Sequence, residues 1–295
     1  MTFRLLITIL VVPFVAFAGC APQETSPATA PGVPSASVFP ADDLGRNVVK
    51  KVARRVACIG PGATEIVYAL GAGDRLVGRD EYSDFPAQAK KVAVVGDFKG
   101  PFLESLIAAK PDLLIVQGES YTRASLENWQ KKSGVAIAAI NANNIKELEA
   151  DIQKIGAWLD VRKTIAIPFV PSSVPARRVF LEVSRAPLMT AGDDTLVGDA
   201  MKYASLKNVA GEIIGYKPYN LESLIAKNPD VYIVTSKEKP AVVLQQLRNQ
   251  AGLKNLECIR RGRVAVVDPD LFLRPSPRLK EGIAQLRQTV SNVPK

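Results

Sequence analysis

The sequence contains no histidine among its 295 residues, and this absence removes several kinds of chemistry. Imidazole is the usual base of Ser-His-Asp and Cys-His catalysis, and it is the usual ligand when a protein captures bare zinc. The phosphate-binding patterns GxxxxGK[ST] and strand-linked GxGxxG are also missing. We therefore expect neither a histidine-dependent enzyme nor a nucleotide-binding protein, and we expect no resident cofactor or metal.

Cysteine is scarce as well, with three residues in the whole chain. Cys58 lies inside the apolar run 56–59, and Cys258 precedes a basic turn late in the sequence. A disulfide between them could form only if the protein is exported to an oxidising compartment. Because they fall in opposite halves of the chain, we prefer the interpretation of two separate buried thiols.

The sequence has one long apolar run, from Leu5 to Phe17. This run is shorter than the roughly 20 residues that a helix needs to cross a bilayer. Arg4 precedes this run, and Phe17-Ala18-Gly19-Cys20 resembles a bacterial lipobox, although Phe17 stands where leucine is usual. The pattern predicts a lipoprotein signal peptide over 1–20, a lipid on Cys20 and an extracytoplasmic location, with simple secretion as the alternative. Residues 21–45 are rich in Pro, Ala, Ser and Thr and predict a flexible tether to the membrane.

The formal charge is +9, but no basic surface is indicated. Lysine and arginine are scattered among acids, and the short basic clusters lack interleaved aromatic residues. We expect no nucleic-acid partner.

An internal repeat is the strongest positive feature. Residues 102–116 read FLESLIAAKPDLLIV and return 118 residues later, at 220–234, as NLESLIAKNPDVYIV, with ten of fifteen positions identical. Each copy predicts a short helix that ends before a Pro-Asp break and leads into a buried strand. The sequence therefore predicts an α/β fold of two similar doubly wound lobes, at 46–163 and 177–295, facing each other across a ligand cleft and joined by a single linker at 164–176.

Within the first lobe, the run 56–59 predicts a strand, residues 60–62 a turn, and residues 64–70 a helix. A further short strand is predicted over 76–78. The paired carboxylates at 193–194 and 268–270 are interpreted as helix caps or local backbone acceptors rather than as catalytic or metal-binding groups.

Seven motifs follow one another along the chain: RVACIGPGATEIVYALGAGDRLVG, YSDFPAQAKKVAVVG, FLESLIAAKPDLLIV, MTAGDDTLVGDAM, NLESLIAKNPDVYIV, RRGRVAVVD and RPSPRLKEGIAQL. This ordered set resembles class III periplasmic binding proteins, the receptors of ABC importers for cobalamin, ferric siderophores and haem. The resemblance implies a monomeric capture-and-deliver protein that works with a permease dimer and its ATPase subunits and catalyses no reaction.

The resemblance implies that Glu104 and Glu222, one in each repeated LESLIA segment, dock onto arginines of the permease. Two exposed anions at matched sites suit a roughly twofold basic surface. The alternative is that each glutamate only favours the start of its helix.

The resemblance also implies a set of ligand contacts. Tyr82 and Phe98 would lie against a large flat chelate, because aromatic faces suit such a ligand. Arg274 would point into the cleft, although a salt bridge that fastens the last helix is an alternative that suits Arg278 better. The remaining candidates are Pro61, Gly62 and Ala63 on the floor, and Tyr216, Tyr219 and Arg185 from the second lobe.

The chain departs from the family at the linker, where a long rigid helix usually joins the lobes. Prolines 168, 171 and 175 forbid a continuous helix there, so we expect a short extended connection. The favoured ligand is a corrinoid, because EYSDFPAQAKKV is close to cobalamin receptors; a ferric siderophore or haem is the alternative. A third hypothesis is that the chain is a lipoprotein enzyme or sensor with the same fold.

Overall fold

The structure is a computed structural model that describes residues 39–118, 120–170 and 176–294. These residues belong to one compact unit. Cys20 and most of the predicted tether lie outside the described residues, so lipidation and tethering stay predictions. No helix in the described ranges has both the length and the apolar character needed to cross a membrane.

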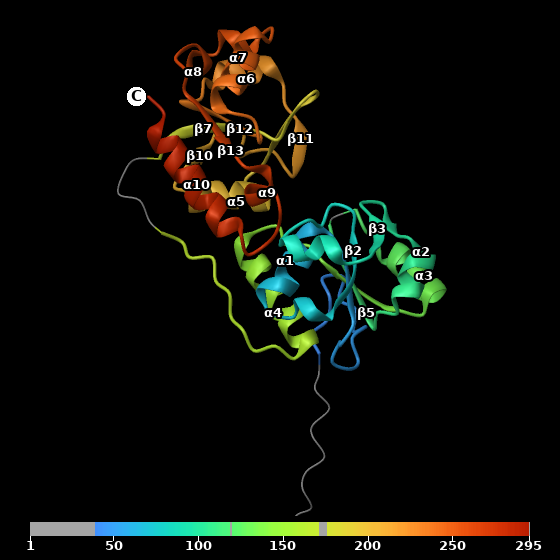
Figure 1. The fold of residues 1–295 in the computed structure, drawn as a ribbon. Coiled ribbons are helices and arrows are strands. Elements are labelled where there is room, and N and C mark those ends of the chain that lie inside the picture. Colours follow the sequence, from blue (N-terminus) through green and yellow to red (C-terminus); the bar gives the residue numbers. More distant parts are fainter. Residues whose placement is uncertain (1–38, 119, 171–175, 295) are drawn as a thin grey trace, which may run out of the picture. The chain divides into compact units, whose positions relative to one another are not determined.

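The first half of the chain forms a six-stranded sheet in the order β4-β3-β2-β1-β5-β6, drawn in blue to green in Figure 1. All neighbouring strands run parallel except β4, which is antiparallel to β3. The strands are β1 Val56–Ile59, β2 Leu76–Asp80, β3 Val94–Asp97, β4 Gly100–Pro101, β5 Leu113–Gln117 and β6 Ala136–Ile140.

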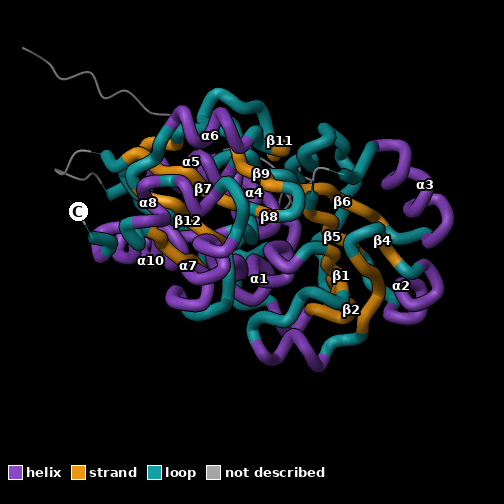
Figure 2. Tube along the Cα trace, turned by 90° about the horizontal axis from the view of Figure 1, so that it is seen from above, coloured by secondary structure: helices purple, strands orange, loops and turns teal. Residues whose placement is uncertain are grey.

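Helices cover both faces of this sheet, because its strands are apolar on both sides. Cys58 and Ile115 face one apolar cluster, which α1 and α4 share, whereas Ala57 and Leu114 face another, which contains residues of α2 and α3. Figure 2 shows α2 and α3 on the opposite side of the strands from α1. The helices are α1 Pro61–Ala69, α2 Leu103–Ala109, α3 Arg123–Ser133 and α4 Ile145–Leu159.

The second half repeats the central strand order. Its parallel sheet runs β10-β7-β12-β13, in which the repeated strand β12 lies beside β7 as β5 lies beside β1. A separate antiparallel sheet runs β11-β9-β8. The strands are β7 Arg178–Glu182, β8 Ser184–Arg185, β9 Leu188–Ala191, β10 Lys207–Asn208, β11 Tyr216–Pro218, β12 Val231–Thr235 and β13 Val264–Val267.

Helices again cover both faces of the second parallel sheet. Residues of α5 and α10 pack on the face that carries Val179 and Ile233, and residues of α6, α7 and α8 pack on the face that carries Phe180 and Tyr232. The predicted α/β class and paired architecture are thus confirmed. The helices are α5 Leu196–Tyr203, α6 Leu221–Lys227, α7 Pro240–Asn249, α8 Glu257–Arg260, α9 Pro269–Phe272 and α10 Leu279–Asn292.

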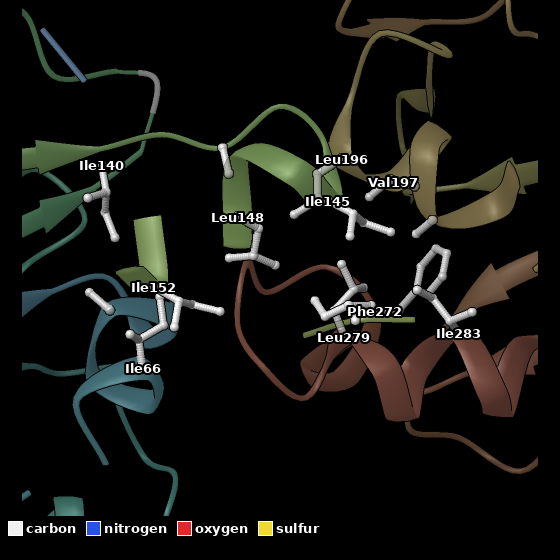
Figure 3. Close-up of a cluster of buried hydrophobic side chains, with 14 of the residues drawn as sticks. Ile66, Ile140, Ile145, Leu148, Ile152, Leu196, Val197, Phe272, Leu279 and Ile283 are labelled. Carbon is white, nitrogen blue, oxygen red and sulfur yellow. The ribbon is translucent and has the colours of Figure 1, made fainter. Parts of the chain in front are cut away.

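The largest apolar cluster includes residues of both halves. Ile66 of α1 and Leu148 of α4 belong to the same cluster as Leu196, Phe272 and Leu279 of the second half (Figure 3). Helix α4 also meets the second half through the backbone, because the Ile145 N–H donates to the Asp199 carboxylate at 3.0 Å.

The linker contains no helix in its described part, as the prolines predicted. Residues 161–170 have neither helix nor strand, and the chain crosses this stretch as an irregular trace (Figure 1). Ile167 is buried in the large apolar cluster, and its N–H donates to Glu149 of α4 at 2.6 Å. The linker is therefore fastened along α4 instead of forming a helix of its own.

Three local expectations change. Residues 60–62 are not a free turn, because α1 begins at Pro61 with Gly60 as its N-cap, and proline is favoured at the first helical position. Strand β2 continues to Asp80. Residues 39–45, assigned to the tether, pack on the first half: Asp42 is buried, and the Trp158 indole donates to the Pro40 carbonyl at 2.9 Å.

The two described cysteines agree with the preferred interpretation. Cys58 and Cys258 are both free and buried, and they belong to different apolar clusters. Burial raises the pKa of both thiols. Each acts as a small core residue.

Candidate functional site

A hollow of about 180 Å³ opens where strands β1, β2, β3 and β5 reach their carboxyl ends. Parallel sheets place ligands at this edge, because the loops that follow the strands meet there. The lining residues are Ile59, Gly60, Pro61, Asp80, Tyr82, Phe98, Gln117, Ser120 and Tyr121.

The aromatic pair predicted to meet the ligand lies in this hollow. The rings of Tyr82 and Phe98 are 6.2 Å apart between centroids, with 53° between their planes. They are 49% and 62% exposed, which is unusual for side chains of this size, so neither is held as core packing. The Lys99 ammonium lies 5.5 Å from the Phe98 centroid.

A buried carboxylate, Asp80, fixes the loop that carries Tyr82. Its Oδ1 accepts from the Tyr82 N–H at 2.7 Å, and its Oδ2 accepts from the Gly60 N–H at 2.7 Å and from the Ser83 hydroxyl at 2.6 Å. The Ser83 hydroxyl accepts in turn from Thr64 at 3.0 Å. Asp80 thereby ties the aromatic loop to the start of α1, a role that the sequence analysis missed.

The predicted floor residues lie in the first turn of α1. Pro61 lines the hollow, whereas Gly62 and Ala63 are buried beneath it. The Ala63 N–H donates to the Gln117 side chain at 3.0 Å, and Gln117 donates to the Pro275 carbonyl at 2.9 Å. A Cβ on Gly62 would lie 2.2 Å from that carbonyl oxygen, so glycine is required where the two halves touch.

An ion cluster holds the RPSPR segment of the second half against α1. The Glu65 side chain, 2% exposed, accepts two hydrogen bonds from Arg278 at 2.9 Å and one from Arg274 at 3.2 Å. Arg274 also pairs with Asp84 at 3.0 Å and with Asp270 at 2.8 Å. The salt-bridge interpretation is confirmed for Arg278 and applies to Arg274 too, while a ligand contact from Arg274 stays a prediction.

The titration behaviour of the site follows from these contacts. Burial acts to raise the pKa of Asp84, but the hydrogen bond and charge of Arg274 outweigh it and hold that pKa below its usual value. Burial, with the charges of Asp80 and Asp97, raises the pKa of Tyr121 to about 12. A hydrogen bond and the charge of Glu81 raise the pKa of Tyr82. Both phenols are therefore neutral hydrogen-bonding groups at neutral pH.

The second-half candidates do not line this hollow. Arg185 donates to Glu182 at 2.8 Å and to Gln246 at 3.1 Å. The Tyr219 ring packs 5.3 Å from that of Phe180, against the second apolar cluster. Tyr216 is 36% exposed in β11. Their ligand roles stay predictions.

Glu104 and Glu222 occupy equivalent positions. Each lies in the first turn of a seven-residue helix, α2 or α6, and each is exposed. Neither forms a salt bridge within the described part of the chain.

Other acidic residues have local roles. Asp268 caps α9 by accepting from the Asp270 N–H at 2.8 Å, and Asp194 accepts from the Gly215 N–H at 3.0 Å. The described ranges contain no group of three or more acidic or cysteine side chains suited to a metal ion.

Comparison with known proteins agrees with this fold. The family model described as "Periplasmic binding protein" matches residues 56–164 and 170–271. The uncharacterized ABC transporter substrate-binding lipoprotein YvrC of Bacillus subtilis is 29% identical, over 95% of each chain. A vitamin B12-binding protein of Vibrio vulnificus is 25% identical, over 81% of this chain and 90% of its own. The crystal structure of a periplasmic haem-binding protein from Pseudomonas aeruginosa superposes with a TM-score of 0.68 at 26% identity, over 82% of this chain and 95% of its own.

Proposed function

Because the chain belongs to the periplasmic binding protein family, we propose that it captures a corrinoid such as cobalamin in the aromatic hollow of its first half. The chain is a substrate-binding protein of an ABC transporter, and its named relatives are binding proteins rather than enzymes. Its partners are a membrane permease and an ATPase.

One observation carries the proposal: Tyr82 and Phe98 present exposed rings beside a hollow at the carboxyl edge of the sheet. A corrin is broad and largely apolar on its faces, so it can cover both rings and remove their surface from water. The hollow alone is smaller than the roughly 300 to 1,000 Å³ of common ligand sites. It would therefore hold one side of the ligand, and residues of the second half would cover the other. Several relatives named vitamin B12-binding proteins support this choice.

Haem or a ferric siderophore is the second candidate. A siderophore supplies its own oxygen ligands to the iron, whereas haem iron takes a protein ligand; the chain has no histidine, so the Tyr82 phenol is the candidate ligand for haem. The raised pKa of Tyr82 acts against this ligation, because the phenol must lose its proton to bind the metal. Haem-binding and iron-binding proteins among the similar solved structures support the candidate.

Titration of the full-length chain in detergent separates the candidates. Cyanocobalamin, haemin and ferrichrome are added in parallel, and binding is followed by calorimetry and by tryptophan fluorescence. Trp129 is a useful reporter, because its ring lies 5.6 Å from that of Tyr121, which lines the hollow. We expect one-to-one binding of cyanocobalamin, weakened about tenfold or more by Tyr82→Ala. Binding of haemin or ferrichrome alone would overturn the corrinoid assignment and retain the importer role.

For delivery, Glu104 and Glu222 would each dock onto basic groups of one permease subunit. Their exposure, their equivalent positions and their lack of salt bridges within the described residues support this role. Lipid on Cys20 would hold the protein near the membrane, as a monomer.

A further inference from the structure

The helices of the two repeat copies share exposed side chains as well as buried ones. The exposed side chains Glu104, Ser105, Ile107 and Ala108 are each identical to their counterparts in the second copy. Packing accounts for identity at the buried positions but does not require it at these exposed ones, because core positions are the ones that folding constrains.

The isoleucines are the least expected members of this surface. Ile107 is 47% exposed and Ile225 is 42% exposed, although a fully buried leucine beside each of them already anchors its helix. A β-branched side chain favours neither the helix nor the solvent. The fold of α2 and α6 thus gives no reason for isoleucine at both positions.

Each isoleucine follows its glutamate by three positions, so the two side chains lie on the same face of a short helix. Each patch therefore combines one carboxylate that forms no salt bridge with the described residues and one exposed apolar group. Because both patches present the same groups, they suit a partner that offers the same surface twice.

We propose that Ile107 and Ile225, together with Glu104 and Glu222, form two matched docking patches that seat on an apolar surface beside basic groups, one on each subunit of the permease dimer. This inference rests on the proposed function. The glutamates steer and orient the encounter, and the isoleucines supply the contact that excludes water and slows dissociation.

The test compares how surface variants dock to a purified permease–ATPase complex in lipid nanodiscs. The complex to use is one whose ATPase activity rises when the wild-type chain is added. Ile107→Ser and Ile225→Ser should each weaken docking about tenfold, mainly by faster dissociation. Val242→Ser is the matched control, because Val242 is 46% exposed on α7 and lies outside both patches. Ligand affinity should be unchanged in all three variants, and the thermal midpoint should fall by a similar small amount in each, because the three side chains are about equally exposed.

Glu104→Gln and Glu222→Gln test the acidic docking contacts separately from the apolar contacts of the isoleucines. If these variants weaken docking while the isoleucine variants dock like the wild type, the apolar contact is overturned and the acidic docking stands. If none of the four variants differs from the Val242→Ser control, the docking role of both helices is overturned.

Discussion

Arg55 and Arg178 make the same pair of contacts in the two halves of the molecule. The Arg55 guanidinium donates to the carbonyls of Ala109 and Lys110 at 2.7 and 2.8 Å, where α2 ends. The Arg178 guanidinium donates to the equivalent carbonyls of Lys227 and Asn228, where α6 ends. Cations are favoured at this end of a helix, where the last carbonyls have no partner within the helix.

We expect Arg55→Ala and Arg178→Ala to lower the free energy of unfolding by about 1 kcal/mol each, because each removes exposed hydrogen bonds to a helix C-terminus. The two losses should add in the double variant, since the sites share no contact. Urea unfolding measures both values. Lys51→Ala, an exposed change in the loop before β1 and away from any helix end, is the control and should have little effect. Unequal losses would show that the contacts are not energetically equivalent.

Glu65→Ala should lower the free energy of unfolding by about 3 to 5 kcal/mol, because it leaves Arg274 and Arg278 without the buried carboxylate that they share. Glu257→Ala breaks a more exposed pair with Arg261 and should lower the same quantity by about 1 kcal/mol or less. Urea is the suitable denaturant, because it does not screen charge. A small loss for Glu65→Ala would mean that the apolar contacts alone hold the halves together.

Asp80→Asn should weaken ligand binding although Asp80 itself need not touch the ligand. The amide keeps one acceptor oxygen and loses the charge that holds the backbone of Gly60 and Tyr82, so stability should fall by about 1.5 to 3 kcal/mol. The less ordered Tyr82 ring should reduce affinity about tenfold. Asp194→Asn, which removes a carboxylate from a loop of the second half, should leave affinity unchanged. Calorimetric titration distinguishes the two outcomes.

Asp151→Asn should change how stability depends on pH. Burial, followed by the charge of Asp43, raises the pKa of Asp151 to about 7 even though Lys154 lies 3.0 Å away. A raised carboxyl pKa contributes stability below the unfolded pKa, about 4, and this contribution is lost as pH rises through about 7. Between these values the wild type should lose up to about 1.4 kcal/mol per pH unit relative to the variant. Thermal melts of both proteins at pH 4 to 8 test this. If the wild type and Asp151→Asn lose stability equally as the pH rises, the prediction is contradicted.

The sequence predicted those parts of the fold that depend on local pattern. The repeat, the strand β1, the helix–strand order of each LESLIA copy and the lack of a linker helix all follow from periodicity and from proline. The start of α1 was missed, because Gly60-Pro61-Gly62 is typical of a turn as well as of a helix with proline in its first turn.

The site was predicted in part for the same reason. Tyr82, Phe98 and Pro61 follow strands and do line one hollow. Glu65 and Arg274 are 209 residues apart in the chain, so no local pattern indicates that they meet. Tyr121 was also missed, because it follows β5 without any motif that distinguishes it from a surface aromatic residue.

The irregular path over residues 161–170 has a consequence for engineering. One residue added to a bridging helix would turn everything beyond it by about 100°. One residue added to an extended stretch supplies only about 3.5 Å of slack, which the chain can absorb without rotating the half that follows. The exposed residues 162–164, which come before the buried Ile167, are thus a suitable place to insert a second folded domain such as a circularly permuted fluorescent protein.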